Sequence, residues 1–158
     1  MNNPTTLSTF PDLISKGLGF KILSDDQYIY SIQTYTGKAK KSTPLTENAR
    51  KQIQEYLNGK RLKFDLPIQV EGTDFQKVVW KNLSKIKYGK TISYQELAEK
   101  SGSEKAFRAA GGACGKNPCL IVIPCHRVVT KSGKVGGFAG GLELKRKLLS
   151  LEGNGSMK

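Results

Sequence analysis

The sequence is poor in the residues that form disulfides or bind metals. Its 158 residues contain three cysteines and a single histidine. An odd number of cysteines without a disulfide framework predicts a reducing compartment. A structural zinc site needs four ligands. The available candidates have spacings of 5, 6 and 1 residues, which match no common zinc pattern; they are Cys114, Cys119, Cys125 and His126. We therefore expect no bound metal.

The chain also lacks long apolar runs and a signal peptide. No apolar run approaches the roughly 18 residues that a membrane span needs. The first residues, MNNPTTLSTF, lack a basic start followed by an apolar block. Apolar residues make up 37% and charged residues 25%, which is typical of a globular chain with a core. These features predict a cytoplasmic protein, nuclear if the source is eukaryotic, without a membrane partner.

Acidic residues are scarce, particularly in the second half. The net charge is +13. Residues 1–72 hold ten Lys/Arg and seven Asp/Glu, whereas residues 73–158 hold sixteen and six. A basic half favours a polyanionic partner, with nucleic acid first and an acidic membrane surface second. The charge alone would equally fit a solubilising surface.

The first part of the chain predicts a small mixed α/β domain over residues 1–71. Apolar residues alternate on both sides of a turn at 24–27, which predicts two strands; they are Phe20, Ile22, Tyr28, Tyr30 and Ile32. Thr43-Pro44 predicts the start of a helix. Its apolar face is Ile53, Tyr56 and Leu57, and Asn58-Gly59 ends it. Glu71-Gly72 is interpreted as a junction.

Residues 72–158 predict a mostly helical domain. Thr73 to Gln76 is a candidate capping box, and an apolar face follows at Phe75, Val78, Val79, Leu83 and Ile86. Trp80 is expected in the core. After a turn at 88–90, Ser93 to Glu96 is a second capping box that opens a short helix through Leu97 and Ala98. Ser101-Gly102-Ser103 ends it.

Ser103 then caps a helix of unusually small residues. Ala106, Ala109, Ala110 and Ala113 recur at helical spacing, and the two helices predict a helix-turn-helix. A helix that reads the major groove normally carries long polar side chains. A smooth helix suits the minor groove and contacts independent of sequence. Tight packing against neighbouring helices would explain the small residues equally well.

The last part of the chain alternates short buried and flexible segments. Residues 120–123 are apolar and deliver Pro124-Cys125-His126, a turn follows at 131–134, and a glycine-rich loop spans 135–141. A final helix over 142–151 is expected to place leucines inward and basic residues mostly outward; these are Leu144, Leu148 and Leu151, and Lys145, Arg146 and Lys147.

The adjacent pair Cys125-His126 is the candidate nucleophile and base. A free thiol has a pKa near 8.5, so a nearby imidazole that accepts its proton raises the thiolate fraction. The imidazole itself needs a third group to orient it. Sequence neighbours rarely face each other, so a bend at Pro124 or a bridging water must connect them. Alternatively, Cys125 is a buried packing residue and His126 a surface one.

Several blocks together resemble the O6-alkylguanine-DNA alkyltransferases. They are Arg108 to Ala113, Lys116-Asn117-Pro118 and Ile123 to Val129, with Tyr88 to Tyr94 upstream and Gly140-Gly141-Leu142 and Leu148-Leu149 downstream. The resemblance runs from about Gly72 to Gly153. It implies an α+β fold, with a ribonuclease H-like N-terminal domain packed on a winged-helix-like, helix-turn-helix C-terminal domain.

The resemblance also implies the activity. An alkyl group on O6 of guanine, or on O4 of thymine, in double-stranded DNA would be transferred once to Cys125, leaving a stable thioether. No cofactor is needed, and a monomer is expected. In this scheme His126 is the base, Glu152 orients it, Tyr94 protonates guanine N3, and Asn117 organises the turn around the site.

The remaining roles follow from the same resemblance. Arg108 would replace the flipped base in the stack, since a paired base cannot reach a buried thiol. Other expected DNA contacts, through the minor groove, are Gln95, Ser103, Ala109, Ala110, Gly112, Ala113 and Lys131. The lesion pocket would be walled by Pro124, Val135, Gly136, Phe138, Ala139 and Gly140.

The chain departs from the family at two pocket positions and at its N-terminal part. Phe138 and Ala139 stand where Tyr and Ser are frequent, so tolerance for bulky groups is expected to differ, with benzyl still accepted. The zinc site of some relatives should be absent, because neither Cys nor His precedes Cys114. Cys114 and Cys119 are expected to be packing residues.

Three other functions fit the sequence less well than alkyl transfer does. A non-catalytic alkyltransferase-like protein would bind the same lesions, but such proteins replace the cysteine that is present here as Cys125. A Cys-His hydrolase is disfavoured by the adjacent spacing and the basic charge. A transcription regulator would need a helix that reads one sequence.

Overall fold

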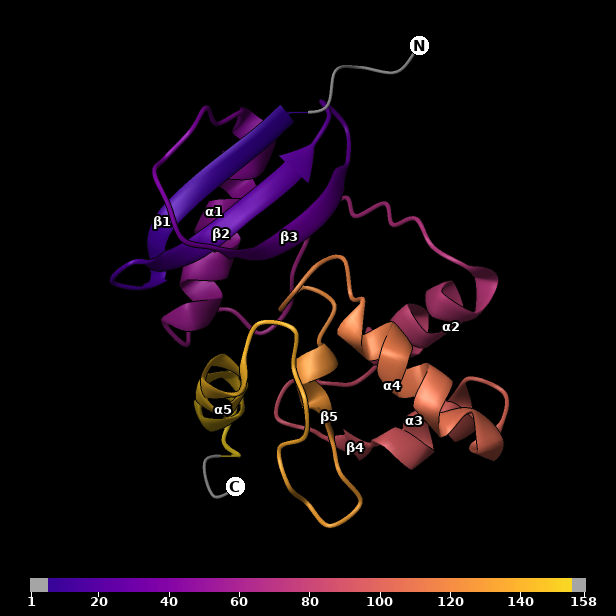
Figure 1. Ribbon diagram of the computed structural model, residues 1–158. Coiled ribbons are helices and arrows are strands. Elements are labelled where there is room, and N and C mark those ends of the chain that lie inside the picture. The colour runs from indigo at the N-terminus through magenta and orange to yellow at the C-terminus, as the bar shows by residue number, and fades with distance from the viewer. Residues whose placement is uncertain (1–5, 155–158) are drawn as a thin grey trace. The chain divides into compact units, whose positions relative to one another are not determined.

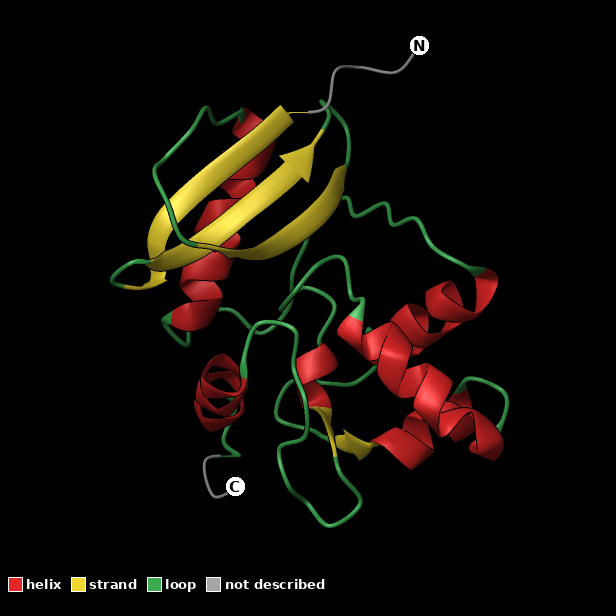
Figure 2. Cartoon of the chain, in the orientation of Figure 1, coloured by secondary structure: helices red, strands yellow, loops and turns green. Residues whose placement is uncertain are grey.

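The computed structural model describes residues 6–154 and has an α+β fold (Figures 1 and 2). The chain divides between Glu71 and Gly72 into two compact units. Within the described residues, no helix is long and apolar enough to cross a membrane.

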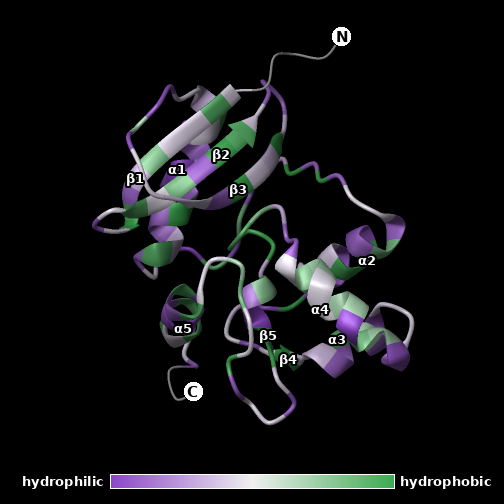
Figure 3. Cartoon of the chain, in the orientation of Figure 1, coloured by the Kyte–Doolittle hydropathy of each residue, from purple (hydrophilic) through white to green (hydrophobic). Residues whose placement is uncertain are grey.

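The N-terminal unit is an antiparallel sheet with one helix. The strands are β1 (Thr6–Ser15), β2 (Leu18–Ser24) and β3 (Ile29–Tyr35), paired in chain order, and α1 (Pro44–Leu57) packs against β1 and β2. Hydrophobic and hydrophilic residues mix along each strand (Figure 3). The sequence prediction of α1 is confirmed at both ends: the Thr43 side chain accepts a hydrogen bond from the Thr46 backbone, and Asn58 is the C-cap.

The strand phase predicted around β3 is confirmed at Ile32 and wrong at Tyr28 and Tyr30. Ile29 and Ile32 are fully buried, whereas Tyr28 is 40% exposed. The pairing explains this difference, because Leu23 faces Ser31 while the adjacent Ser24 faces Ile29, so Tyr30 is an extra residue in a bulge. A bulge shifts the side-chain alternation by one residue, which period-two reasoning cannot anticipate.

The C-terminal unit is mainly helical. Its elements in order are α2 (Asp74–Leu83), β4 (Ile92–Ser93), α3 (Tyr94–Lys100), the 3-10 turn η1 (Glu104–Ala106), α4 (Phe107–Gly115), the 3-10 turn η2 (Cys125–Arg127), β5 (Val128–Val129) and α5 (Leu142–Leu151). The predicted capping box of Thr73 and Gln76 is present. Trp80 is buried as expected, and its indole N–H donates to the carbonyl oxygen of Ala113 at 2.9 Å.

Two predicted helix faces need correction. Val78 is 44% exposed, and Trp80 lies on the buried face of α2 with Val79 and Leu83. In α4 the buried residues are Ala110, Ala113 and Cys114, whereas Ala109 is exposed. Ala110, Ala113 and Cys114 follow the i, i+3, i+4 spacing of one face of α4, and Ala109 lies beside that face.

Parallel pairing of β4 with β5 brings together the two segments that carry Tyr94 and Cys125. Ile92 faces Val128 and Ser93 faces Val129. Tyr94 opens α3 directly after β4, and Cys125 opens η2 directly before β5. A two-residue ladder therefore positions residues that are about thirty apart in the sequence.

Candidate active site

Cys125 lies at the wall of a small cavity in the C-terminal unit. It is 4% exposed, and its backbone N–H donates to the carbonyl oxygen of Ile123 at 2.8 Å. Pro124 precedes it as the N-cap of η2, which turns the chain sharply between the buried segment and β5. The cavity has a volume of about 180 Å³, and its other lining residues are Tyr94, Gly111, Cys114, Gly115, Gly137, Phe138 and Ala139.

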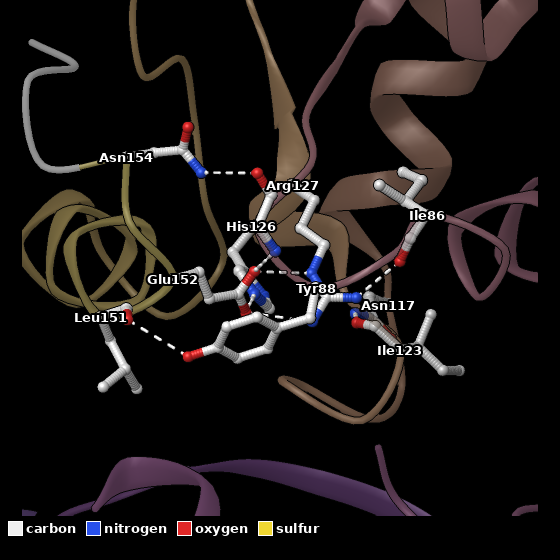
Figure 4. A network of polar contacts seen from close by, with 10 residues as sticks. Ile86, Tyr88, Asn117, Ile123, His126, Arg127, Leu151, Glu152 and Asn154 are labelled. Carbon is white, nitrogen blue, oxygen red and sulfur yellow. Dashed lines mark hydrogen bonds and ion pairs between the residues drawn. The ribbon is translucent and has the colours of Figure 1, made fainter. Parts of the chain in front are cut away.

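His126 and Glu152 form a buried pair next to the cysteine in sequence. Nε2 of His126 lies 2.7 Å from Oε2 of Glu152, and neither side chain is exposed. Glu152 is the C-cap residue of α5. Figure 4 shows the carboxylate between the imidazole and a guanidinium. The imidazole is therefore held through Nε2.

Arg127 holds the same carboxylate from its other side, and sequence reasoning did not single it out. Its Nε donates to Oε1 of Glu152 at 2.8 Å and its Nη2 to Oε2 at 3.1 Å. Its Nη1 donates to the carbonyl oxygen of Ile86 at 2.6 Å, and the guanidinium lies 5.7 Å from the centre of the Tyr88 ring. A buried bidentate pair of this kind fixes the carboxylate in one orientation.

Asn117 bridges the turn that precedes the cysteine. Its Nδ2 donates to the carbonyl oxygen of Ile123 at 2.7 Å, and its Oδ1 accepts from the backbone N–H of Cys119 at 2.9 Å. The turn contains Ile121 at φ 72°, a left-handed conformation that is strained for a β-branched residue. Asn117 thus stabilises a backbone shape that the local sequence disfavours.

Burial sets the resting protonation of the pair. It raises the pKa of the Cys125 thiol, and the hydrogen bond with Asn117 and the charge of Lys145 oppose that shift. Burial also lowers the pKa of His126, against the opposing effect of Glu152. Both shifts favour the neutral forms, the thiol of Cys125 and the uncharged imidazole of His126.

Tyr94 closes another side of the cavity. Its hydroxyl donates to the carbonyl oxygen of Gly137 at 3.2 Å. Burial is the main cause that raises the pKa of Tyr94 to about 12, and the charges of the nearby Cys114 and Cys125 add to it. The phenol therefore keeps its proton at neutral pH. Gly136, at φ 73°, lies against the Tyr94 ring, where an added Cβ would come within 3.1 Å of ring carbon and hydroxyl.

Lys145 is buried in the site, and the expectation that it faces outward is wrong. Its side chain has no exposed surface, and Nζ donates to the carbonyl oxygens of Val128 at 2.6 Å and Gly137 at 3.0 Å. Burial lowers its pKa to about 8. The sequence did hold a signal for this burial. Leu144 and Leu148 mark the buried face of α5, and Lys145 is adjacent to Leu144 on that face.

A larger hollow of about 680 Å³ opens beside the start of α4. Its lining residues are Tyr94, Gln95, Glu104, Lys105, Phe107, Arg108, Gly111, Thr130 and Lys131. It thus brings together Arg108, Gln95 and Lys131, three of the expected DNA contacts. Phe107, which sequence reasoning missed, is 50% exposed there.

The other expected DNA contacts do not line this hollow. The side chains of Ala110 and Ala113 are buried, while Ala109 and Gly112 are exposed on α4. Ser103 is exposed and caps η1 by accepting from the backbone N–H of Lys105.

The expected pocket residues also divide. Phe138 and Ala139 line the cavity of Cys125. Val135 is buried with Val129 and Leu149. Pro124, Gly136 and Gly140 flank lining residues in the chain without lining the cavity themselves.

Comparisons with known proteins give a consistent result. A family model described as "6-O-methylguanine DNA methyltransferase, DNA binding domain" matches residues 74–154. A methylated-DNA–protein-cysteine methyltransferase of Methanosarcina acetivorans is 40% identical over 141 residues, covering 84% of this chain and 90% of the relative. One of Methanosarcina barkeri is 50% identical over 106 residues, covering 67% of each.

Solved structures agree with the sequence matches. The crystal structure of Mycobacterium tuberculosis O6-methylguanine methyltransferase superposes with a TM-score of 0.82 at 34% identity, covering 94% of this chain and 93% of the other. The structure of the Mycobacterium tuberculosis protein in complex with DNA gives a TM-score of 0.78 at 34% identity, with the same coverage.

Proposed function

The chain belongs to the 6-O-methylguanine DNA methyltransferase family, and from this membership we propose that it repairs DNA by moving an alkyl group from O6 of guanine to Cys125. The observation that carries the proposal is the position of the Cys125 thiol. It borders a cavity of about 180 Å³, and Cys125 directly precedes in sequence the His126 of the buried His126–Glu152 pair. A cavity of this size suits a small alkyl group, and O4-alkylthymine is proposed as a second substrate.

The chemistry is a single displacement at carbon. The sulfur of Cys125 forms a bond to the alkyl carbon as the bond from that carbon to O6 breaks, and the electron pair passes to the guanine ring. The thiol proton goes to His126, and the Tyr94 hydroxyl supplies a proton to guanine N3, so that neutral guanine leaves. The proton held by His126 then returns through solvent to the phenolate of Tyr94. Overall, the thiol hydrogen and the alkyl group change places. No step restores the thiol, so each molecule acts once.

The surroundings of the reacting atoms prepare this step. Glu152 orients the imidazole and stabilises its protonated form, in the manner of other nucleophile–base–carboxylate sites. The amide of Asn117 and the ammonium of Lys145 favour the thiolate. The raised pKa of Tyr94 keeps its hydroxyl protonated until guanine N3 accepts the proton. No metal or cofactor enters the scheme.

For DNA binding we propose that α3 and α4 form a helix-turn-helix in a winged-helix-like domain of residues 72–158, and that residues 1–71 form a ribonuclease H-like domain. The smooth exposed face of α4 supports an approach to the minor groove of double-stranded DNA. Arg108 would fill the space of the flipped base, with Gln95 and Lys131 on the flanking backbone. We propose that the protein acts as a monomer.

Intact mass spectrometry tests the function directly. The protein is mixed with excess duplex containing O6-methylguanine, and Cys125→Ser serves as the control. We expect a gain of one methylene per molecule that saturates at one and is absent in the control. Binding of the lesion without any mass gain would instead favour a non-catalytic lesion-binding protein.

A further inference from the structure

A second basic hollow lies on the C-terminal unit, and no role is assigned to it above. It has a volume of about 510 Å³ and is called the lysine hollow here; its lining residues are Asn82, Lys85, Ile86, Lys87, Lys90, Ile92 and Lys100. These come from the end of α2, the segment that leads to β4, and the end of α3. The lysine hollow shares no lining residue with the Cys125 cavity or with the hollow beside Arg108.

The four lysines of the hollow carry unneutralised charge. All are exposed, and within residues 6–154 none of them takes part in an ion pair with a carboxylate. Like charges gathered around one hollow repel each other, so a bound anion would relieve that repulsion.

The frame of the hollow is fixed even though its lysines are flexible. The Asn82 amide donates to the carbonyl oxygen of Lys100 at 3.0 Å and to the Ser101 hydroxyl at 3.2 Å, which ties the ends of α2 and α3 together. Ile86 is buried, and its carbonyl oxygen is held by Arg127. The lysines therefore project from a fixed backbone, and one residue of it, Ile86, is also hydrogen-bonded to Arg127 of the active-site network.

The chemistry of the lining selects the kind of anion. A lysine ammonium is a compact point charge, without the planar fork with which arginine recognises one phosphate or carboxylate. The one side-chain amide, on Asn82, is already engaged. Such a lining holds phosphates by charge alone, as proteins do when they follow a nucleic-acid backbone regardless of sequence.

We propose that the lysine hollow is a second binding surface for the phosphodiester backbone of double-stranded DNA, separate from the surface around Arg108. The proposal rests on the proposed function, because it assumes that DNA is the macromolecular partner. The phosphates belong either to a distant part of the duplex that holds the lesion or to a second duplex, and both sources present the same chemistry.

Salt-dependent binding of two variants tests the proposal. Lys87→Gln/Lys90→Gln removes two charges from the hollow, and Lys77→Gln/Lys81→Gln removes two exposed charges from α2 as a matched control. Equilibrium binding is measured on a short duplex and on a long one over a range of salt concentrations. Each lost phosphate contact lowers the slope of log K against log salt by about 0.9, so we expect a loss of about 1.8 for the hollow variant only.

The result also identifies the source of the phosphates. A smaller salt dependence of the hollow variant on the long duplex alone indicates phosphate contacts along the same DNA. If sedimentation shows that the wild type binds a second equivalent of short duplex and the hollow variant does not, the phosphates belong to a separate DNA. Equal slopes for both variants, together with no second equivalent for the wild type, would overturn the proposal. Methyl transfer measured by mass on the same samples is expected to persist. Its absence from the wild type would refute the proposed function instead.

Discussion

The ammonium nitrogen of Lys145 lies 2.6 Å from the carbonyl oxygen of Val128, and its charge is buried in the same site as the Cys125 thiol. It joins β5, which follows the cysteine, to the glycine-rich loop through the carbonyl oxygen of Gly137. The same charge opposes the effect of burial on the pKa of Cys125. One side chain thus shapes the cavity and favours the reactive form of its nucleophile.

Replacing this lysine should slow alkyl transfer without involving DNA. We expect Lys145→Met to raise the pKa of Cys125 and to reduce the rate with free O6-benzylguanine roughly tenfold at neutral pH, since one pKa unit corresponds to a tenfold change in thiolate. The rate is measured by mass spectrometry under single-turnover conditions. Arg146→Met, an exposed neighbour, is the control. An unchanged pH profile in Lys145→Met would contradict the electrostatic role.

The pH dependence of the same reaction should bend near pH 8. Because the pKa of Cys125 is raised, the thiolate fraction and the rate grow with pH, by about tenfold per unit below that pKa. Lys145, whose pKa is about 8, loses its charge as pH rises through that value and then favours the thiolate less. We therefore expect a shallower rise above pH 8 in the wild type and an unbroken rise in Lys145→Met.

Removing Arg127 should weaken the fold. Arg127→Met leaves the buried carboxylate of Glu152 without its bidentate partner. Breaking a buried pair in this way typically costs about 3–5 kcal/mol, measured as the free energy of unfolding in urea. The exposed Arg146→Met variant should change stability by less than about 0.5 kcal/mol. Similar stability of both variants would show that the pair is not important for folding.

Phe107 should matter only when the substrate is in DNA. It is 50% exposed beside Arg108 at the start of α4, and apolar side chains at minor-groove surfaces often wedge between base steps. We expect Phe107→Ala to lower the transfer rate from duplex DNA by roughly tenfold, since stacking on a base contributes about 1–3 kcal/mol. The reaction with free O6-benzylguanine should be unchanged. A parallel loss in both reactions would mean that Phe107 supports the fold instead.

Cys114 should limit the size of the transferred group. It lines the cavity of Cys125, and burial raises its pKa to about 12, so it acts as a neutral wall. Cys114→Leu adds bulk to that wall. We expect benzyl transfer to fall at least tenfold and methyl transfer to fall much less, because a misfit in an apolar pocket changes selectivity by about 10–200-fold. Competition between the two substrates, resolved by product mass, gives the ratio, and an unchanged ratio would place the limit elsewhere.

Elements with local start and stop signals were predictable from sequence. Thr43-Pro44 and Asn58 bound α1, and α5 spans residues 142–151 as expected. β1 was not predicted, because Pro11 and Asp12 interrupt its alternation, with Asp12 at φ 61° and a register shift between Phe10 and Ser15. A proline within an alternating run argues against a strand until the pairing is seen.

The candidate site was predictable in part. Cys125 and His126 could be named as a candidate pair from their adjacency, and Glu152 only as what the family resemblance implies; the structure brings His126 and Glu152 together. Arg127 could not be recognised, because its burial depends on acceptors far away in sequence, Glu152 and the carbonyl oxygen of Ile86. Lys145 was missed although its spacing from Leu144 and Leu148 agrees with the buried face of α5.

The hydrogen bond from Trp80 to Ala113 gives the protein its own optical probe. Trp80 is the only tryptophan in the sequence, so intrinsic indole fluorescence reports one environment. That environment includes a carbonyl of the last turn of α4, one residue before Cys114. Any shift of α4 on contact with DNA, or on filling of the cavity by an alkyl group, changes the polarity around the indole. Emission could therefore follow both events in real time on the unlabelled protein.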